Sequence, residues 1–407
     1  MDKEVAKNEV RLEATMKGKK YTALSLLFIM IFVLLIASTV RAIEVTSTIT
    51  VGNTPENLAY DSGKNEIFVP NYNGNSVSII SDTSNSVVAT VTVGISPWSV
   101  AYDSNKSEVF VANSGSNTVS IISDNNNTIV ATVNVGANPW GLTYNSAKGE
   151  VFVTNTGSNT VSVISDSSNA VVATIPVGDK PTGITYDSGT GQIFVSNVGT
   201  NTVSVISDSS NVVVATIQVG NYPVGLAYDS AKGEIFVANS KDNTVLAISD
   251  TSYSVVANVT LLSGASPFGL TYDSGRGEVF VANSGSNTVS AISDSTYTVV
   301  ETVAVGTTPK FVVYDSDKGE IFASNSASNS VSVISDSSST SASPCPTITV
   351  SKSPTSIPSA TSTVSPSSSP TVPEFSSAAF ILVAAAAAVM ALGAVAKNIK
   401  SQKSKRN

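Results

Sequence analysis

Two series of aspartates recur along the chain and are the first candidates for chemistry, because carboxylates bind hard cations such as calcium. One Asp lies in "YDS" and the other ends "ISD". The first series is Asp61, Asp103, Asp187, Asp229, Asp273 and Asp315, with Asn145 at the third position. The second is Asp82, Asp124, Asp166, Asp208, Asp250, Asp294 and Asp336. Calcium needs roughly six to eight oxygens converging on one point, whereas each repeat supplies these carboxylates singly. The favoured interpretation is that they form turns, since Asp bonds its own backbone there.

Composition removes other kinds of site. Histidine is absent, which excludes the commonest general base and metal ligand. The single cysteine, Cys345, lies between two prolines and cannot form an internal disulfide. An idle exposed thiol and an intermolecular disulfide both stay open for it. We expect no metal site and no cofactor.

Charge argues against nucleic acid as a partner. Residues 43–336 hold 25 acidic and 9 basic residues, a balance of −16 within a chain whose net charge is −8. Binding to nucleic acid begins with the neutralisation of phosphates, which such a domain is poorly suited to do.

The aspartates are positioned by an internal repeat. A Gly-x-x-Pro element recurs every 42 residues, with one two-residue insertion before the sixth copy. The seven copies begin at Gly52, Gly94, Gly136, Gly178, Gly220, Gly264 and Gly306. A period of about 40–45 residues is typical of four-stranded propeller blades. Helical repeats of similar length are the competing case, but no stretch has apolar residues at helical spacing beyond one turn.

Each unit instead contains short runs of Val, Ile, Thr and Phe that end at Asn, Asp, Ser or Gly, as expected for strands joined by tight turns. The last unit lacks its fourth strand, and an extra strand-like segment, "EVTSTITVG" (44–52), precedes the first unit. We therefore predict an all-β fold, a seven-bladed propeller closed by the N-terminal strand. Positive φ is expected in the first hairpin of each unit, at Gly149, Gly191, Gly233, Gly277, Gly319, Asn65 and Ser107.

These units resemble the YVTN family of propeller repeats. The shared pattern is "P-x-G-L-x-Y-D", "I-F-V-A-N-S-x-x-N-T-V-S-V-I" and "V-V-A-T-I-x-V-G" across residues 43–336, and the namesake tetrapeptide is closest in "VFVTN" (151–155). The resemblance implies a seven-bladed propeller, often in archaeal cell-surface and surface-layer-like proteins. It implies no single activity. Propeller enzymes generally use His, clustered acids or a cofactor at the central channel, so we expect this chain not to be an enzyme.

The copies differ most at the residue after the proline, which leads into the innermost strand. Seven such residues should surround one mouth of the channel: Glu56, Trp98, Trp140, Thr182, Val224, Phe268 and Lys310. Tyr222 lies nearby in sequence, and both tryptophans of the chain belong to this set. Aromatic groups at a concave mouth suit recognition of a sugar or peptide. The alternative is that the tryptophans fill the gap between neighbouring blades.

The two ends of the chain predict export. Residues 1–20 form a charged segment, 21–42 a signal peptide or uncleaved anchor, and 376–396 a second apolar span before the basic tail 397–407. Both charged ends should stay in the cytoplasm by the positive-inside rule. Residues 337–375, rich in Ser, Thr and Pro, predict a disordered or O-glycosylated stalk.

The stalk ends in Pro373, Glu374 and Phe375. With the apolar span and basic cluster that follow, it is similar to the archaeal PEF-type C-terminal sorting signal. That resemblance implies cleavage near Pro373 and attachment to lipid or envelope.

Three glycosylation sequons begin at Asn105, Asn126 and Asn258. The first two fall in expected hairpin turns and the third in a strand-like context.

Together these features predict a membrane-anchored propeller outside the cell, acting without catalysis in adhesion, envelope structure or interaction with surface proteins or glycans. A ligand-binding or enzymatic propeller with an acid-lined or metal site in its channel is the alternative. A soluble sensor, released after two cleavages, is the alternative for its location.

Overall fold

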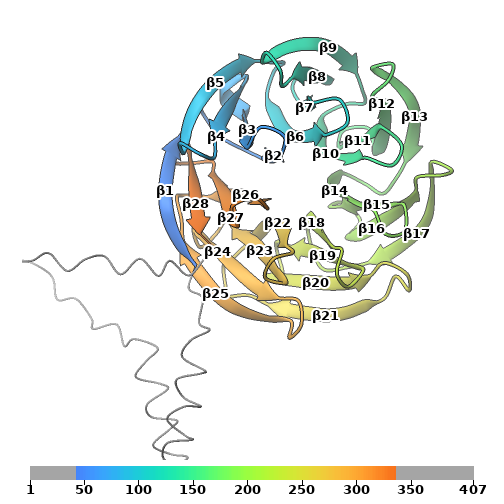
Figure 1. Cartoon of the computed structure of the whole chain (residues 1–407). Coiled ribbons are helices and arrows are strands. Elements are labelled where there is room, and N and C mark those ends of the chain that lie inside the picture. The colour runs from blue at the N-terminus through green and yellow to red at the C-terminus, as the bar shows by residue number, and fades with distance from the viewer. Residues whose placement is uncertain (1–42, 336–407) are drawn as a thin grey trace, which may run out of the picture. The chain divides into compact units, whose positions relative to one another are not determined.

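The computed structural model describes residues 43–335. Its strands form seven four-stranded antiparallel sheets arranged as blades around a central axis (Figure 1). The predicted seven-bladed propeller is therefore confirmed. Segments 1–20, 21–42, 337–375, 376–396 and 397–407 lie outside the described residues, as do Asp336, Cys345, Pro373, Glu374 and Phe375. Within residues 43–335, no helix is long and apolar enough to span a membrane.

Each blade runs from an innermost strand to an outermost one. The innermost strands are β2 (Ala59–Asp61), β6 (Pro97–Asp103), β10 (Pro139–Asn145), β14 (Pro181–Asp187), β18 (Pro223–Asp229), β22 (Pro267–Asp273) and β26 (Pro309–Asp315). The second strands are β3 (Glu66–Asn71), β7 (Glu108–Asn113), β11 (Glu150–Asn155), β15 (Gln192–Asn197), β19 (Glu234–Asn239), β23 (Glu278–Asn283) and β27 (Glu320–Asn325).

The third strands are β4 (Ser76–Ser81), β8 (Thr118–Ser123), β12 (Thr160–Ser165), β16 (Thr202–Ser207), β20 (Thr244–Ser249), β24 (Thr288–Ser293) and β28 (Ser330–Ser335). The outer strands are β5 (Ser86–Thr92), β9 (Thr128–Asn134), β13 (Ala170–Pro176), β17 (Val212–Gln218), β21 (Val255–Thr260), β25 (Thr298–Ala304) and β1 (Glu44–Thr50). A short 3₁₀ turn, η1 (Tyr72–Gly74), follows β3.

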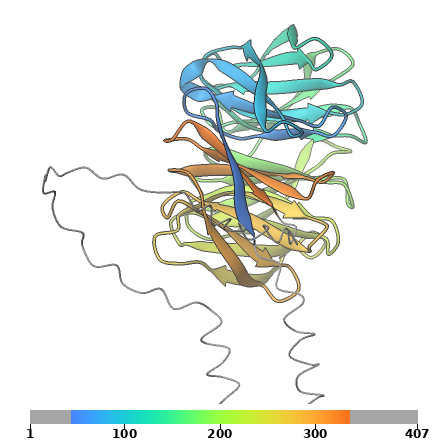
Figure 2. The same ribbon diagram turned by 60° about the vertical axis from the view of Figure 1, so that its left-hand side comes forward.

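The ring closes as the sequence predicts. β1 pairs antiparallel with β28, so the N-terminal strand becomes the outer strand of the seventh blade (Figures 1 and 2). Ile43 and Ile49 are buried, and Val51 N donates to Asn329 O at 3.0 Å. The two ends of the repeat are thus joined by backbone bonds and by packing.

Packing between blades uses one aromatic position per blade. The third residue of each second strand is a phenylalanine with no exposed surface: Phe68, Phe110, Phe152, Phe194, Phe236, Phe280 and Phe322. Burial of a large aromatic side chain is worth about 1.5–3 kcal/mol. This phenylalanine, which recurs in every blade, is therefore a constant part of the packing between blades.

The first hairpin of each blade turns through a left-handed residue, as predicted. Gly149, Gly191, Gly233, Gly277 and Gly319 have φ between 65° and 70°, and Asn65 and Ser107 have φ of 59° and 56°. Glycine adopts this conformation without strain, and Asn tolerates it better than Ser does.

Candidate functional site

The aspartates of "YDS" form turns. Asp61 Oδ1 accepts hydrogen bonds from Gly63 N at 2.8 Å and Lys64 N at 3.3 Å. Asn145 accepts the same two bonds with its amide oxygen, from Ala147 N at 3.0 Å and Lys148 N at 3.3 Å. The role needs only a side-chain oxygen, which explains why Asn replaces Asp in the third blade.

The aspartates of "ISD" join neighbouring blades. The lysine of one hairpin forms an ion pair with the aspartate of the next blade, as between Lys64 Nζ and Asp124 Oδ1 at 3.6 Å. The same contact recurs in the pairs Lys106–Asp166, Lys148–Asp208, Lys232–Asp294 and Lys318–Asp82. The last pair spans the closure between the seventh and first blades. These charges form structural contacts between blades.

The two aspartate series meet at these seams, which sequence reasoning missed. Burial raises the pKa of Asp124, and the charge of Asp61 raises it further. At the third blade, Asn145 Nδ2 donates instead to Asp208 Oδ2 at 3.0 Å. Among residues 43–335, no group of three or more acids and cysteines is placed to hold a metal ion.

The repeated asparagines also have structural roles. Asn113 Nδ2 donates to Thr118 Oγ1 at 3.2 Å and to Ser120 Oγ at 3.0 Å. In "SNT", Asn117 Oδ1 accepts a bond from Asn138 N at 2.8 Å. That bond holds the residue before the next proline, which has φ of 53°. These residues connect hairpins to blade junctions.

Most of the predicted channel-mouth residues gather at the start of the innermost strands. Trp140 and Val224 belong to one buried cluster, and Trp98 and Phe268 pack against it. Glu56 and Thr182 are buried polar residues. Tyr222 is 39% exposed and has its ring 4.6 Å from Lys241 Nζ. It is not part of that cluster.

Five aromatic rings form a continuous plug at this mouth: Tyr72, Trp98, Trp140, Phe268 and Phe311. The ring centroids are 5.1 Å apart for Tyr72–Trp98 and 5.2 Å for Trp98–Trp140. Trp140 lies 5.6 Å from Phe311 and 6.1 Å from Phe268, and Phe268 and Phe311 are 5.3 Å apart. The plug therefore links blades one, two and three to blades six and seven.

Tyr72 and Phe311 were not predicted. Phe311 lies two residues after its proline, at a position occupied by Gly141, Gly183, Gly225 and Gly269 in four other blades. Adjacent innermost strands approach closely there: a Cβ on Gly141 would lie 2.5 Å from Thr182 O. A large side chain in a series of glycines was the available signal.

The plug leaves little free space beside it. A cavity of about 50 Å³ is lined by Trp140, Phe311, Asn57, Leu142, Ile184, Leu226, Leu270 and the three glycines Gly141, Gly183 and Gly225. Pockets for small molecules are usually about 300–1,000 Å³. The alternative interpretation of the tryptophans, as packing between blades, therefore describes Trp140 well.

Among the channel-mouth residues, Glu56 is the one whose pKa suits general acid–base catalysis. It is 3% exposed, and its Oε1 accepts a hydrogen bond from Ser326 Oγ at 3.2 Å. Burial raises the pKa of Glu56 to about 7, although the positive charge of Lys310 lowers it. Burial also lowers the pKa of Lys310, whose Nζ lies 4.0 Å from the centroid of Phe268.

The raised pKa of Glu56 makes stability depend on pH. Its carboxyl keeps a proton between pH 4.5 and about 7 in the folded protein and loses it in the unfolded chain. Stability is therefore lost as pH rises through this window, by about 3 kcal/mol.

We expect Glu56→Gln to be more stable than wild type at pH 8 and equally stable at pH 4.5, in denaturant unfolding. Glu44→Gln, at an exposed position, is the control. An equal effect of both changes at pH 8 would contradict this.

Two sequons lie in turns, as predicted. Asn105 follows β6 and Asn126 follows β8, and both are exposed. Asn105 Nδ2 donates to Tyr144 Oη at 2.7 Å and to Ser146 O at 3.3 Å, and a glycan on this nitrogen would leave it one N–H for these two acceptors. Asn126 Oδ1 accepts a bond from Thr128 Oγ1 at 2.7 Å. Asn258 lies exposed within β21.

Comparison with protein-family models and with curated proteins finds no match to this chain. Solved structures share its fold. Hydrazine synthase from Kuenenia stuttgartiensis superposes with a TM-score of 0.63 at 20% identity, covering 69% of this chain and 95% of that one. A streptogramin B lyase superposes with a TM-score of 0.63 at 12% identity, covering 72% of this chain and 97% of that one. At these identities the similarity shows the fold alone, which is a β-propeller.

Proposed function

We propose that the chain is a non-enzymatic propeller displayed outside the cell, where it acts in adhesion or envelope structure by binding other surface proteins or glycans. The observation that carries this proposal is the composition of the outer strands, which form the circumference of the ring. Its strands expose aliphatic side chains and almost no charge.

On six of the seven blades the outer strand has a valine that is about half exposed at one equivalent position, and β17 and β21 each have a second valine, Val212 and Val255, that is exposed to a similar extent. This valine belt consists of Val88, Val130, Val172, Val214, Val256 and Val300. Among the seven outer strands, only β1 and β25 carry a charged residue, Glu44 and Glu301. Edge strands of monomeric proteins are usually protected by charge or proline, and exposed apolar surface marks sites of association. The belt therefore suits lateral contacts with a neighbouring molecule in an envelope.

The two ends of the chain support the location. Two apolar stretches, 21–42 and 376–396, bracket the propeller and a Ser/Thr/Pro-rich stalk. The resemblance to YVTN repeats and to a PEF-type sorting signal at Pro373–Phe375 adds to this, and both belong to the proposal. Release of a soluble form after two cleavages is the competing outcome, which cell fractionation separates.

Charges placed on the belt should disrupt association while the fold is kept. We expect the triple variant Val88→Lys, Val130→Lys and Val172→Lys to lose at least about tenfold in co-sedimentation with isolated envelope, because each lysine must be desolvated at an apolar contact. Its free energy of unfolding should change by less than about 1 kcal/mol.

A matched variant places three lysines on the same blades in exposed turns and keeps the sequon at Asn126: Ser84→Lys, Asn125→Lys and Ser168→Lys. It changes the net charge equally and should co-sediment like wild type. Equal loss in both variants would indicate a general charge effect, and no loss in either would refute the belt as the contact surface.

A second candidate is ligand binding or catalysis at the channel mouth. Glu56 favours it, because a buried carboxyl with a pKa of about 7 can take up or release a proton near neutral pH. Trp98 and Trp140 are the only tryptophans of the chain. Their fluorescence should therefore change when a ligand binds at the plug. Titration with envelope glycans and peptides tests this, and constant fluorescence would remove the candidate.

A further inference from the structure

The junction into the sixth blade differs from the other six. In the regular junctions, the Gly-x-x-Pro glycine lies directly over the buried asparagine that ends the second strand. A Cβ on Gly94 would lie 2.6 Å from Asn113 Cγ, and one on Gly136 would lie 2.6 Å from Asn155 Cγ. Glycine is required there because the asparagine amide occupies the space of a side chain.

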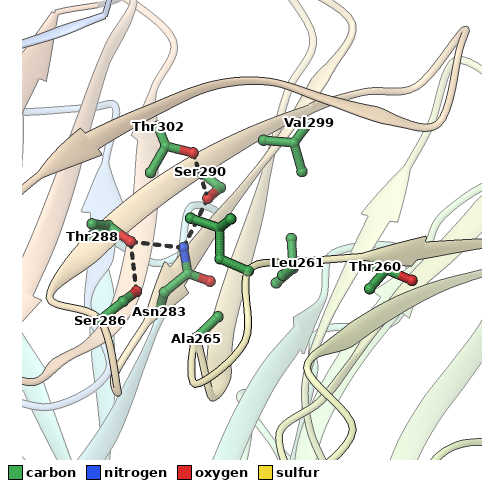
Figure 3. Close-up of a pocket in the computed structure, with 10 residues that line it drawn as sticks. Thr260, Leu261, Ala265, Asn283, Ser286, Thr288, Ser290, Val299 and Thr302 are labelled. Carbon is green, nitrogen blue, oxygen red and sulfur yellow. Dashed lines mark hydrogen bonds between the residues drawn. The ribbon is translucent and has the colours of Figure 1, made fainter. Parts of the chain in front are cut away.

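In the junction with the two-residue insertion, the Gly-x-x-Pro glycine no longer contacts this amide. Between Leu261 and Ala265, three residues stand where the other junctions have one glycine. Gly264 has φ of 79°, and a Cβ on it would have nothing within 4 Å. Asn283, the equivalent of Asn113, is therefore not covered by a glycine. A pocket of about 260 Å³ opens over it (Figure 3).

One wall of this insertion pocket, defined by the ten residues that line it, consists of neutral polar side chains hydrogen-bonded to one another. Ser286 Oγ and Thr288 Oγ1 are 2.8 Å apart, and Asn283 Nδ2 donates to Thr288 Oγ1 at 3.1 Å and to Ser290 Oγ at 2.8 Å. Ser290 Oγ and Thr302 Oγ1 are 3.0 Å apart (Figure 3). Asn283 is 2% exposed, and its Oδ1, like that of the equivalent asparagine in each other blade, has no hydrogen-bond partner within the described part of the chain; only at Asn283 does a pocket rather than a glycine lie over the amide. A ligand hydroxyl could donate to this oxygen.

The other wall is aliphatic. Leu261, Leu262, Ala265 and Val299 line it, and Leu262 is 72% exposed. None of the ten lining residues carries a charge. A charged ligand would lose its hydration without gaining a counter-charge, whereas a molecule with hydroxyls on one side and C–H groups on the other would satisfy both walls.

We propose that the insertion pocket binds one neutral sugar residue, with its hydroxyls toward Asn283, Ser290 and Thr302 and its C–H face toward Leu261 and Val299. The volume is somewhat below the usual range for small-molecule sites, which limits the ligand to a single ring. The proposal deepens the proposed function by naming a class of glycan partner, but it rests on a surface separate from the valine belt.

The test uses the full-length chain in mild detergent and a panel of methyl glycosides of glucose, galactose, mannose and N-acetylglucosamine, with glucuronic acid as the charged probe. Saturation-transfer NMR should detect binding of at least one neutral glycoside and none of glucuronic acid. Absence of binding by every neutral glycoside, or binding of glucuronic acid alone, would overturn the proposal.

Deletion of Leu262 and Ser263 provides the sharpest variant, because it restores the spacing of the other six junctions and places Gly264 over Asn283. It should fold with unchanged stability and lose binding. Thr302→Val should weaken binding about fivefold. Thr132→Val, the same change in the second blade, should have no effect. Binding that persists in the folded deletion variant would overturn the assignment. Envelope co-sedimentation of the deletion variant should stay normal, so this failure is distinct from failure of the valine belt.

Discussion

Replacement of residues 43–51 by a nine-residue Gly/Ser linker should open the ring. The replacement removes β1 from β28 and leaves the seventh blade with three strands. It also removes the buried side chains of Ile43 and Ile49, which are each 5% exposed in the folded chain. These two side chains alone contribute roughly 3–6 kcal/mol. Domains of this kind have about 5–15 kcal/mol of total stability. We therefore expect loss of cooperative unfolding, measured by circular dichroism in denaturant.

The matched control deletes residues on the C-terminal side of the propeller sequence. Deletion of residues 340–375 removes only part of the Ser/Thr/Pro-rich segment, so the unfolding midpoint should match that of wild type. If the two variants proved equally stable, the closure by β1 would carry no energetic weight.

Trp140→Thr should destabilise the protein by about 3 kcal/mol, since Trp140 is 8% exposed and contacts Trp98, Phe268 and Phe311. Thr is the residue that the fourth blade has at this position, as Thr182. The change therefore tests packing with a residue that another blade already has at this position. Denaturant unfolding at constant pH gives the difference.

Trp98→Thr is the comparison, with an expected loss of about 1–2 kcal/mol because Trp98 is only half-buried. A loss below about 1 kcal/mol for Trp140→Thr, together with weaker binding to envelope glycans, would contradict the packing role. That result would instead make the plug a recognition surface.

The architecture was predictable because it depends on local rules applied seven times. Gly149 and Asn65 were expected at positive φ from turn geometry, and residues 44–52 were expected to replace a missing strand. The plug was predicted only in part, since Phe311 and Tyr72 reach it from positions outside the compared series. The meeting of Asp61 with Asp124 was not predictable from spacing, because it depends on how two blades pack.

The insertion before the sixth Gly-x-x-Pro element was visible in the sequence, but its consequence was not. The consequence required knowing that Gly94 and its equivalents cover a buried amide, which is a contact between a junction and the following blade. Variation in a repeat therefore locates a site only when the structural role of the regular copy is known.

Protease treatment of intact source cells tests the central claim most directly. If the propeller is displayed outside the cell, protease should cleave the chain within residues 337–375 while a cytoplasmic marker protein stays intact. The fragment containing residues 43–336 should enter the medium if residues 21–42 are a cleaved signal peptide, and should stay on the cell if they are an uncleaved anchor. Full protection of residues 43–336 until the cells are lysed would place the ring inside the cell and contradict the proposed function.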